Sequence, residues 1–229
     1  MARRRAGGYR APALDALVDN VPAWAALAYF IAAIPTGVLV ARLRGIDLRK
    51  VGSGNIGATN ASRALGAKLG MVVLVLDVLK AATPVWLAMR PEALGSDADA
   101  QLGLSIVAFA AVIGHIFPIY LRFRGGKGVA CALGIFVALD PTVAFAALLL
   151  YVQTLVLTRT SAIGSLTAVS GMTICLFIAD KPVPHQWLSL AVAVVIWARH
   201  TSNVRGLIAE AKARKRASPP LVPPADSDT

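Results

Sequence analysis

Long apolar runs separated by short polar connectors are the main pattern of this chain. A helix needs about 20 apolar residues, and at least about 17, to cross the hydrocarbon core of a bilayer. Asp140-Pro141 breaks one long run in two, because proline ends a helix at the residue before it. The pattern predicts an all-α integral membrane protein with seven transmembrane helices, of which the fourth and the seventh are short. The seven are Val21–Leu43, Lys68–Met89, Gln101–Leu121, Gly128–Leu139, Pro141–Leu157, Ala162–Ala179 and Gln186–Trp197.

We divide the chain into one membrane domain and two tails. Residues 21–203 contain the seven runs, and residues 1–20 form an N-terminal tail without a signal-peptide pattern. Residues 204–229 form a tail that is first basic and then Pro-rich, and the Pro-rich end is typical of a disordered segment.

Composition supports the membrane interpretation and narrows the partners. Of the 229 residues, 57% are hydrophobic and 15% are charged, whereas about 25% are charged in soluble domains. A net charge of +11 is compatible with nucleic-acid binding, but the basic residues lie in the connectors, as in a membrane protein. We therefore expect a lipid bilayer and no nucleic acid as partner, and a monomer. Cys131 and Cys175 lie inside apolar runs, and no cluster of ligands predicts a metal or another cofactor.

The distribution of Lys and Arg predicts the orientation in the membrane. The connectors on one side, with the C-terminal tail, carry 16 of the 23 basic residues, and the other side carries 6. The more basic side is expected in the cytoplasm, which places the C-terminus inside and the N-terminus outside. Four arginines in the N-terminal tail argue for the opposite orientation, and the larger total decides.

The stretch GSGNIGATN, residues 52–60, matches the dinucleotide pattern G-x-G-x-x-G. That fingerprint needs a preceding strand and a surrounding βαβ unit, and a membrane helix precedes it here, so we reject a dinucleotide site. The backbone N–H groups of a glycine loop are still suited to binding an anion. A flexible turn with an N-cap is the alternative. The candidate ligands in and after this loop are Gly52, Ser53, Gly54, Asn55, Thr59, Asn60 and Arg63.

A second glycine loop, GGKG, precedes the fourth apolar run. It is not a Walker A motif, because Leu121 and Gly128 occupy the positions of the first glycine and of the Ser or Thr. Glycines admit a close backbone approach, the helix N-terminus carries partial positive charge, and the lysine adds a full one. A positive-inside lysine in a turn is the alternative. The candidate ligands are Gly125, Gly126, Lys127 and Gly128.

Two further polar connectors fall on the same predicted side, so four loops can form a single site. Asp77 and Lys80 lie at positions i and i+3 of the second run, either as a charge pair on one helix face or as part of a cavity. His115 either braces the GGKG loop or contacts the ligand. The candidates in the two connectors are Ser161, His200 and Asn203.

These stretches resemble the signatures of a known family. GSGNIGATN with Arg63, GHIFP and FRGGKGVA within residues 114–130, DVLKAATPVW (77–86) and His200-x-x-Asn203 look like those of the bacterial acyl-phosphate:glycerol-3-phosphate acyltransferases, the PlsY family. The resemblance runs from about residue 39 to residue 203. It implies a seven-helix membrane enzyme with its N-terminus outside, in agreement with the pattern above.

The resemblance also implies the reaction and the site. An acyl group passes from acyl phosphate to the 1-hydroxyl of sn-glycerol 3-phosphate, giving lysophosphatidic acid and phosphate for phospholipid synthesis at the cytoplasmic face of the bacterial plasma membrane. GGKG would bind phosphate, and the chain departs from the family at Cys131, Ala162, Gly206 and Lys212, which replace Thr, Ser, Arg and Glu. The residues implied to line the substrate site are Ser53, Arg63, Lys127, Ser161, His200 and Asn203.

The residues favour this enzyme over two alternatives. An acyl-CoA donor is disfavoured, because no His has an Asp five residues later. A transporter of organic phosphates needs polar residues through the bilayer, often with inverted repeats, and the sequence has its motifs on one side and no repeat. His200 is the candidate base, unless it binds substrate and the acceptor's own phosphate takes the proton. Ser53 is read as a ligand rather than a nucleophile, since no carboxylate near His200 indicates a triad.

Overall fold

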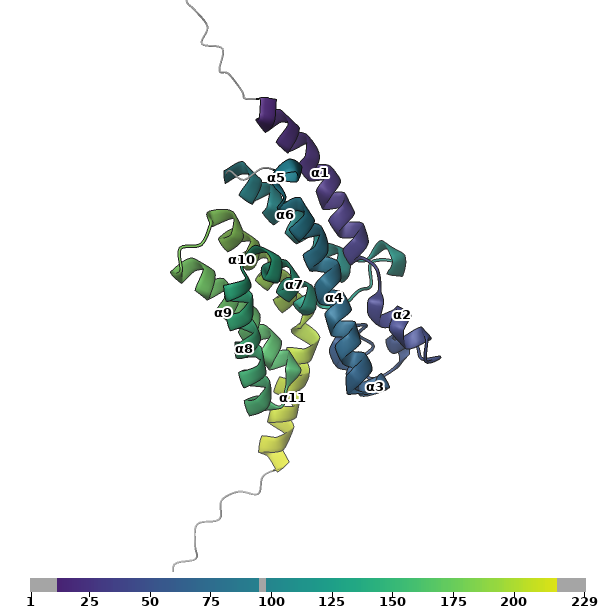
Figure 1. The fold of residues 1–229 in the computed structure, drawn as a ribbon. Coiled ribbons are helices and arrows are strands. Elements are labelled where there is room, and N and C mark those ends of the chain that lie inside the picture. The colour runs from purple at the N-terminus through teal and green to yellow at the C-terminus, as the bar shows by residue number, and fades with distance from the viewer. Residues whose placement is uncertain (1–11, 95–97, 218–229) are drawn as a thin grey trace, which may run out of the picture.

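The computed structural model describes residues 12–94 and 98–217, and all of its regular structure there is helical (Figure 1). The α-helices, in chain order, are α1 (Pro12–Ala32), α2 (Thr36–Arg42), α3 (Ala58–Leu65), α4 (Ala67–Ala88), α5 (Pro91–Leu94), α6 (Ala98–Ile116), α7 (Val129–Leu139), α8 (Pro141–Thr158), α9 (Ser161–Ile178), α10 (Val183–Arg199) and α11 (Thr201–Ala217). Two short 3-10 helices, η1 (Leu48–Lys50) and η2 (Ile119–Leu121), lie in the connectors. The all-α prediction is confirmed.

Five helical segments of the described chain are long and apolar enough to cross a membrane. The remaining apolar helices are shorter: α7 has 11 residues and α10 has 17. At about 1.5 Å per residue, α7 extends roughly 16 Å, about half of a bilayer core. Seven crossings therefore stay a prediction. The five segments are Asn20–Arg42, Ala67–Ala88, Asp99–Leu121, Pro141–Thr158 and Ser161–Ile178.

The first predicted span is broken in the structure. Helix α1 ends at Ala32 and α2 begins at Thr36, with Pro35 between them as the N-cap of α2. Proline has no N–H and disfavours the α conformation at the residue before it, so Ile34 leaves the helix. The membrane domain at residues 21–203 stays a prediction; α1 starts before residue 21, and α11 continues past residue 203.

Close helix contacts surround the core. A Cβ on Gly114 of α6 would lie 2.3 Å from the Tyr29 carbonyl oxygen of α1, and one on Gly134 of α7 would lie 2.3 Å from the Val78 carbonyl oxygen of α4. Glycine is needed at both positions because any side chain would separate the helices. The start of α1 and the end of α11 lie at opposite ends of the molecule (Figure 1).

Candidate active site

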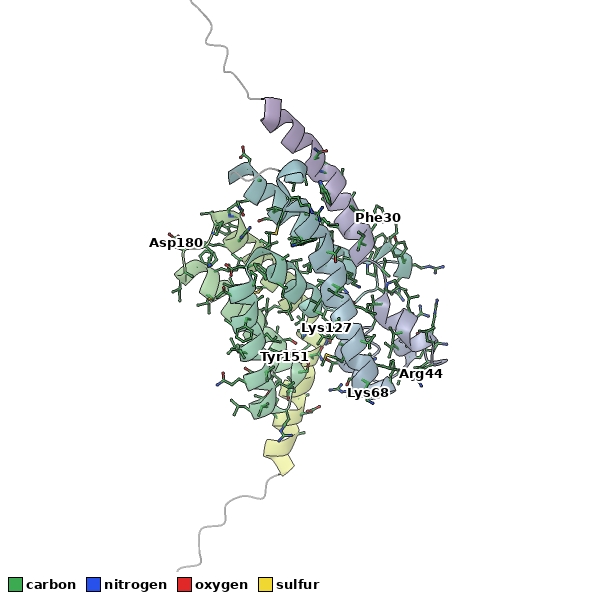
Figure 2. The ribbon with its side chains drawn as sticks, viewed as in Figure 1. Phe30, Arg44, Lys68, Lys127, Tyr151 and Asp180 are labelled. Atoms are coloured by element: carbon green, nitrogen blue, oxygen red, sulfur yellow. The ribbon has the colours of Figure 1, made fainter. Side chains whose placement is uncertain are left out.

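A cavity of about 610 Å³ lies where the polar loops meet, within the size range of small-molecule sites. It brings together residues from all four loops that the sequence singled out. Lys127 and Tyr151 lie near the middle of the molecule, whereas Arg44 and Asp180 lie at its periphery (Figure 2). The predicted site residues that line the cavity are Ser53, Asn55, Thr59, Asn60, Arg63, Lys127, Gly128, Ser161, His200 and Asn203.

Four predicted glycines do not line the cavity, and each has a packing role instead. Gly52 and Gly54 adopt φ of 59° and 69°, in the left-handed region that favours glycine. A Cβ on Gly125 would lie 2.2 Å from the His115 carbonyl oxygen, and one on Gly126 would lie 2.1 Å from the Nε2 atom of His115. These residues let the loops fold tightly around the site without contacting its interior.

The GGKG loop has already used two of its backbone donors. The N–H of Gly125 donates to the carbonyl of Ile116, and the N–H of Gly126 donates to the carbonyl of His115, both at 3.2 Å. Both acceptors lie at the end of α6, so the loop is tied to that helix. The ligand-binding capacity of the loop therefore rests on Lys127 and on the amides that follow it.

Asn60 organises the first glycine loop. Its side chain is buried, and its Oδ1 atom accepts a hydrogen bond from the Ser53 N–H at 3.1 Å. Its Nδ2 group donates to three backbone carbonyls, at 2.8 to 3.1 Å. Because the amide is fully used in this way, Asn60 holds the loop in shape rather than offering free donors to a ligand.

The first turns of four helices border the cavity. The amides of a helix's first turn have no partner within the helix, and the helix N-terminus carries about half a positive charge. Such an end is a ready anion site. The bordering residues are Ala58 and Thr59 of α3, Val129 and Ala130 of α7, Ser161 and Ala162 of α9, and Ser202 and Asn203 of α11.

Three basic side chains, those of Arg63, Lys127 and Arg159, add full charges to this wall. Within the described residues, neither arginine has a salt-bridge partner, and the Nζ of Lys127 donates to the Oδ1 of Asn203 at 2.5 Å. Burial, and then the charges of Arg199 and Arg63, lower the pKa of Lys127. Two carboxylates also line the cavity, Glu210 and the Lys80-paired Asp77, so the basic residues stay in excess, which indicates an anionic ligand.

A chain of hydroxyl groups links opposite sides of the cavity. The Oγ of Ser161 lies 3.1 Å from the Oγ1 of Thr59 and 3.0 Å from the hydroxyl of Tyr151. When Tyr151 and Thr59 both donate to this oxygen, the proton of Ser161 is free for a ligand. The side chain of Ser161 is thereby positioned from α3 and from α8.

His200 is held in one tautomer. Its ring is buried, and its Nδ1 lies 2.8 Å from the carbonyl oxygen of Ile196. A carbonyl only accepts, so Nδ1 carries a proton and Nε2 of the neutral ring is an acceptor. Burial lowers the pKa of His200, the bond to Ile196 partly opposes this, and the charges of Lys127 and Arg199 lower the pKa further. The neutral form, which can take a proton, is therefore favoured.

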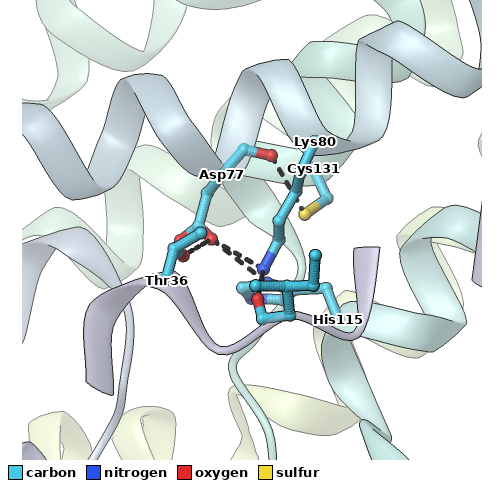
Figure 3. Close-up of polar contacts among 6 residues, drawn as sticks. Thr36, Asp77, Lys80, His115 and Cys131 are labelled. Carbon is cyan, nitrogen blue, oxygen red and sulfur yellow. Dashed lines mark hydrogen bonds and ion pairs between the residues drawn. The ribbon is translucent and has the colours of Figure 1, made fainter. Parts of the chain in front are cut away.

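The two interpretations of the charged residues of α4, a charge pair on one helix face and a part of the cavity, each describe part of the arrangement (Figure 3). Asp77 and Lys80 form a buried ion pair of 2.9 Å, and Asp77 also lines the cavity. The Nζ of Lys80 also donates to the Ile34 carbonyl at the break before α2, and this carbonyl accepts the N–H of Thr36 as well. His115 lines the cavity as well, and its ring lies beneath Gly126, in the space that a Cβ on that glycine would occupy.

Sequence reasoning missed several lining residues. Tyr151 lies within an apolar run, where an aromatic residue is typical of a membrane helix, and Arg159 was counted only as a positive-inside residue. Proximity of Arg159 to Ser161 in the sequence was the one available signal. Other lining residues outside the predicted set are Ser165, Ser202 and Glu210.

Comparison with known proteins decides the family. The model of the family "Glycerol-3-phosphate acyltransferase" matches residues 22–210. The chain belongs to the glycerol-3-phosphate acyltransferase family. A relative of that name from Anaeromyxobacter dehalogenans (strain 2CP-1) is 47% identical over 188 residues, covering 80% of this chain and 91% of the relative.

Two crystal structures of PlsY, an integral membrane glycerol 3-phosphate acyltransferase, have the same fold. The glycerol 3-phosphate form gives a TM-score of 0.78 at 36% identity, and the lysophosphatidic acid form gives 0.76 at 34%. Each match covers 83% of this chain and 92% of PlsY. This glycerol-3-phosphate acyltransferase is thus a multi-pass membrane enzyme. The predicted enzyme class is confirmed, and the transporter alternative is wrong.

The cavity of this acyltransferase also has an apolar lining. Helices α4, α7, α8 and α9 contribute hydrocarbon side chains to it, beside the basic residues and the helix N-termini. One cavity thus offers surfaces for charged and for hydrocarbon groups. The larger apolar lining residues are Leu74, Leu133, Leu148, Val169 and Met172.

Proposed function

We propose that this acyltransferase transfers an acyl group from acyl phosphate to the 1-hydroxyl of glycerol 3-phosphate, releasing lysophosphatidic acid and phosphate. The observation that carries the proposal is the composition of the cavity wall. Four helix N-termini and three basic side chains suit two phosphate groups, and the apolar lining suits an acyl chain. A thioester donor has no phosphate on the reacting carbonyl, so the charges beside the leaving group would lack a partner.

The residues fit the steps of such a transfer. The glycerol 1-hydroxyl attacks the acyl carbonyl, the new C–O bond forms, and the bond to the phosphate oxygen breaks. His200 accepts the hydroxyl proton at Nε2 and can return it to the departing phosphate. Lys127 and the first-turn amides of α7 and α9 stabilise the oxyanion and the leaving group. Because acyl phosphate is already activated, positioning and charge stabilisation carry most of the catalysis.

We further propose that the site faces the cytoplasm of a bacterial cell, in a monomer that crosses the plasma membrane seven times. The excess of Lys and Arg on the side that carries the polar loops supports this orientation. An odd number of crossings also agrees with the opposite positions of the ends of α1 and α11 (Figure 1). Glycerol 3-phosphate would then enter from the side on which it is soluble.

Turnover by the purified protein tests the donor. We expect detergent-solubilised enzyme to release inorganic phosphate and form lysophosphatidic acid from palmitoyl phosphate and glycerol 3-phosphate, and to be inactive with palmitoyl-CoA. The reverse preference would overturn the proposal.

Substitutions of the basic wall test the site. Arg63→Ala and Lys127→Ala each remove a charge that holds phosphate, and we expect each to reduce kcat/KM at least a hundredfold, measured by phosphate release. Arg44→Ala and Lys68→Ala are matched controls, because both side chains are exposed and neither lines the cavity. Full activity in both wall variants, with an unchanged melting profile, would contradict the proposed site.

A further inference from the structure

The carboxylate of Asp77 is a buried group that the chemistry above leaves unused. Its side chain is about 1% exposed and lines the cavity. Oδ1 accepts a hydrogen bond from the Thr36 hydroxyl at 2.5 Å and lies 2.9 Å from the Nζ of Lys80 (Figure 3). Within the described residues, Oδ2 has no hydrogen-bond or ion-pair partner. One oxygen is fixed, and the other is available to a ligand.

Asp77 lies where the two glycine loops approach each other. On one side, Thr36 precedes Gly37, whose Cβ would lie 1.9 Å from the Ile56 carbonyl oxygen in the first loop. On the other side, the Nδ1 of His115 lies 3.6 Å from the Oδ1 of Asp77, and the same ring lies beneath Gly126 of the second loop. The carboxylate thus belongs to the floor of the cavity, between two segments suited to phosphate.

The charge of Asp77 excludes one kind of ligand group and favours another. A carboxylate repels phosphate, whereas it is a strong acceptor for a hydroxyl. Glycerol 3-phosphate has two hydroxyls, and the 2-hydroxyl remains free when the 1-hydroxyl is acylated. We propose that the Oδ2 of Asp77 accepts a hydrogen bond from the 2-hydroxyl of the acceptor, and so makes Asp77 a specificity-determining residue. This inference rests on the proposed function.

Lys80 and Thr36 are positioning residues in this arrangement. Both hold Oδ1, so the carboxylate cannot turn, and Oδ2 stays directed away from them. Lys80 also compensates the charge, because an unpaired carboxylate in a membrane helix is costly. With the phosphate held by the basic wall and the 2-hydroxyl held by Asp77, only the 1-hydroxyl is left to reach the acyl carbonyl.

An acceptor that lacks the 2-hydroxyl tests the contact. We expect the wild-type enzyme to use glycerol 3-phosphate with a kcat/KM about tenfold to a hundredfold above that for 3-hydroxypropyl phosphate, since a hydrogen bond to a charged group is lost. In Asp77→Asn, the amide oxygen is expected to face Lys80 and Thr36, which places an NH2 group at the Oδ2 position. This group can only donate to the oxygen of the 2-hydroxyl, in a neutral hydrogen bond weaker than one to a carboxylate, so the preference should fall to within about threefold.

Asp140→Asn is the matched control. Asp140 is also buried and ion-paired, to Lys181 at 2.8 Å, but it caps α8 and does not line the cavity. We expect it to keep the wild-type preference. Asp77→Asn leaves Lys80 buried without its partner, so the double variant Asp77→Asn/Lys80→Met is the second test and should be the more stable of the two.

Each outcome decides the inference. A wild-type enzyme that uses both acceptors equally overturns it before any variant is made, and so does a folded Asp77 variant that keeps the full preference. If neither Asp77 variant folds, the ratio of kcat/KM for the two acceptors in the wild-type enzyme decides the inference. An enzyme that turns over neither acceptor with acyl phosphate refutes the proposed function instead, so the two failures are distinguishable.

Discussion

At His200, a single hydrogen bond determines which ring nitrogen could act as the proposed base. Because Nδ1 is held by the Ile196 carbonyl, only Nε2 can take a proton from a hydroxyl. The pKa of His200 is lowered below its ordinary value of 6.5, chiefly by burial. The neutral ring therefore persists to lower pH than in a free histidine, and the base is lost only as pH falls through this lowered pKa.

The pH profile of kcat/KM tests this role. We expect the activity contributed by His200 to be constant above pH 6.5 and to decline below it, on the acid side only. The substrate phosphates also titrate near pH 6, so His200→Gln, which should retain only their contribution, is the control. Superimposable profiles for the wild type and this variant would show that another group is the base.

Tyr151 is the second residue whose role is testable alone. Its hydroxyl contacts the Oγ of Ser161, so Tyr151→Phe removes one of the two groups that orient this serine while it keeps the ring. We expect kcat to fall about threefold to tenfold with little change in thermal stability, as a single neutral hydrogen bond suggests. Ser161→Ala should be at least as damaging, and an unaffected Ser161→Ala enzyme would exclude the chain of hydroxyls from the reaction.

At the scale of residues, the sequence indicates which charged residues and glycines belong to the loops of the site better than it indicates which atoms they contact. Arg63 and Lys127 were identified because cations beside glycine loops have few other uses. Tyr151 was missed, since an aromatic residue in a membrane run has the same appearance whether it faces lipid or a cavity. Asn60 was assigned to the ligand, but its contacts to the backbone depend on a loop conformation that no local pattern specifies.

At the scale of elements, the end of α6 supports the GGKG loop. Its last carbonyls accept the amides of Gly125 and Gly126, and its His115 ring leaves no room for a Cβ on Gly126. The loop then delivers Lys127 and the start of α7 to the cavity. In the proposed enzyme, α6 would thereby determine where the loop holds phosphate.

Gly126→Ala tests this support. The added Cβ would lie 2.1 Å from the Nε2 of His115, so the loop has to shift, and we expect kcat/KM to fall at least tenfold although Gly126 does not line the cavity. Gly206→Ala in α11 is the comparison: Gly206 lines the cavity, but nothing lies within 4 Å of its Cβ position and alanine favours the helix, so a small effect is expected. Comparable losses in both variants would contradict the special role of Gly126.

The sequence located most helices but misjudged two of them. Hydropathy merged α1 and α2 into one span, because the break at Pro35 lies within a continuous apolar run. Residues 204–217 of α11 were placed in a tail, since their polar composition has no membrane pattern, although Gly206, Leu207 and Glu210 line the cavity. The first difference follows from Pro35, which hydropathy alone does not weigh, and the second follows from tertiary packing, which brings α11 to the cavity.

At the scale of the whole molecule, the proposed orientation in the membrane rests on the distribution of charge. Arg44 lies on the side with the polar loops, and Asp180 lies on the other, both exposed. With Cys131 and Cys175 replaced by alanine, we expect Asp180→Cys to react with a membrane-impermeant maleimide in intact spheroplasts, and Arg44→Cys to react only after permeabilisation. The opposite pattern would reverse the proposed orientation.

The convergence of helices far apart in the chain is what makes this molecule an acyltransferase in our account. Helices α3, α7, α9 and α11 begin at residues 58, 129, 161 and 201, and their first turns border one cavity. Sequence motifs point to each helix N-terminus separately, and only the packing of the helices shows that these N-termini lie around one cavity.

A structure with bound ligands tests this convergence most directly. The enzyme would be solved with glycerol 3-phosphate and an unreactive acyl phosphonate in place of acyl phosphate. We expect both phosphorus atoms in the cavity, one of them within hydrogen-bond distance of the Nζ of Lys127 and the first-turn amides of α7. Phosphorus density outside the cavity, or at the opposite end near Asp180, would contradict the account.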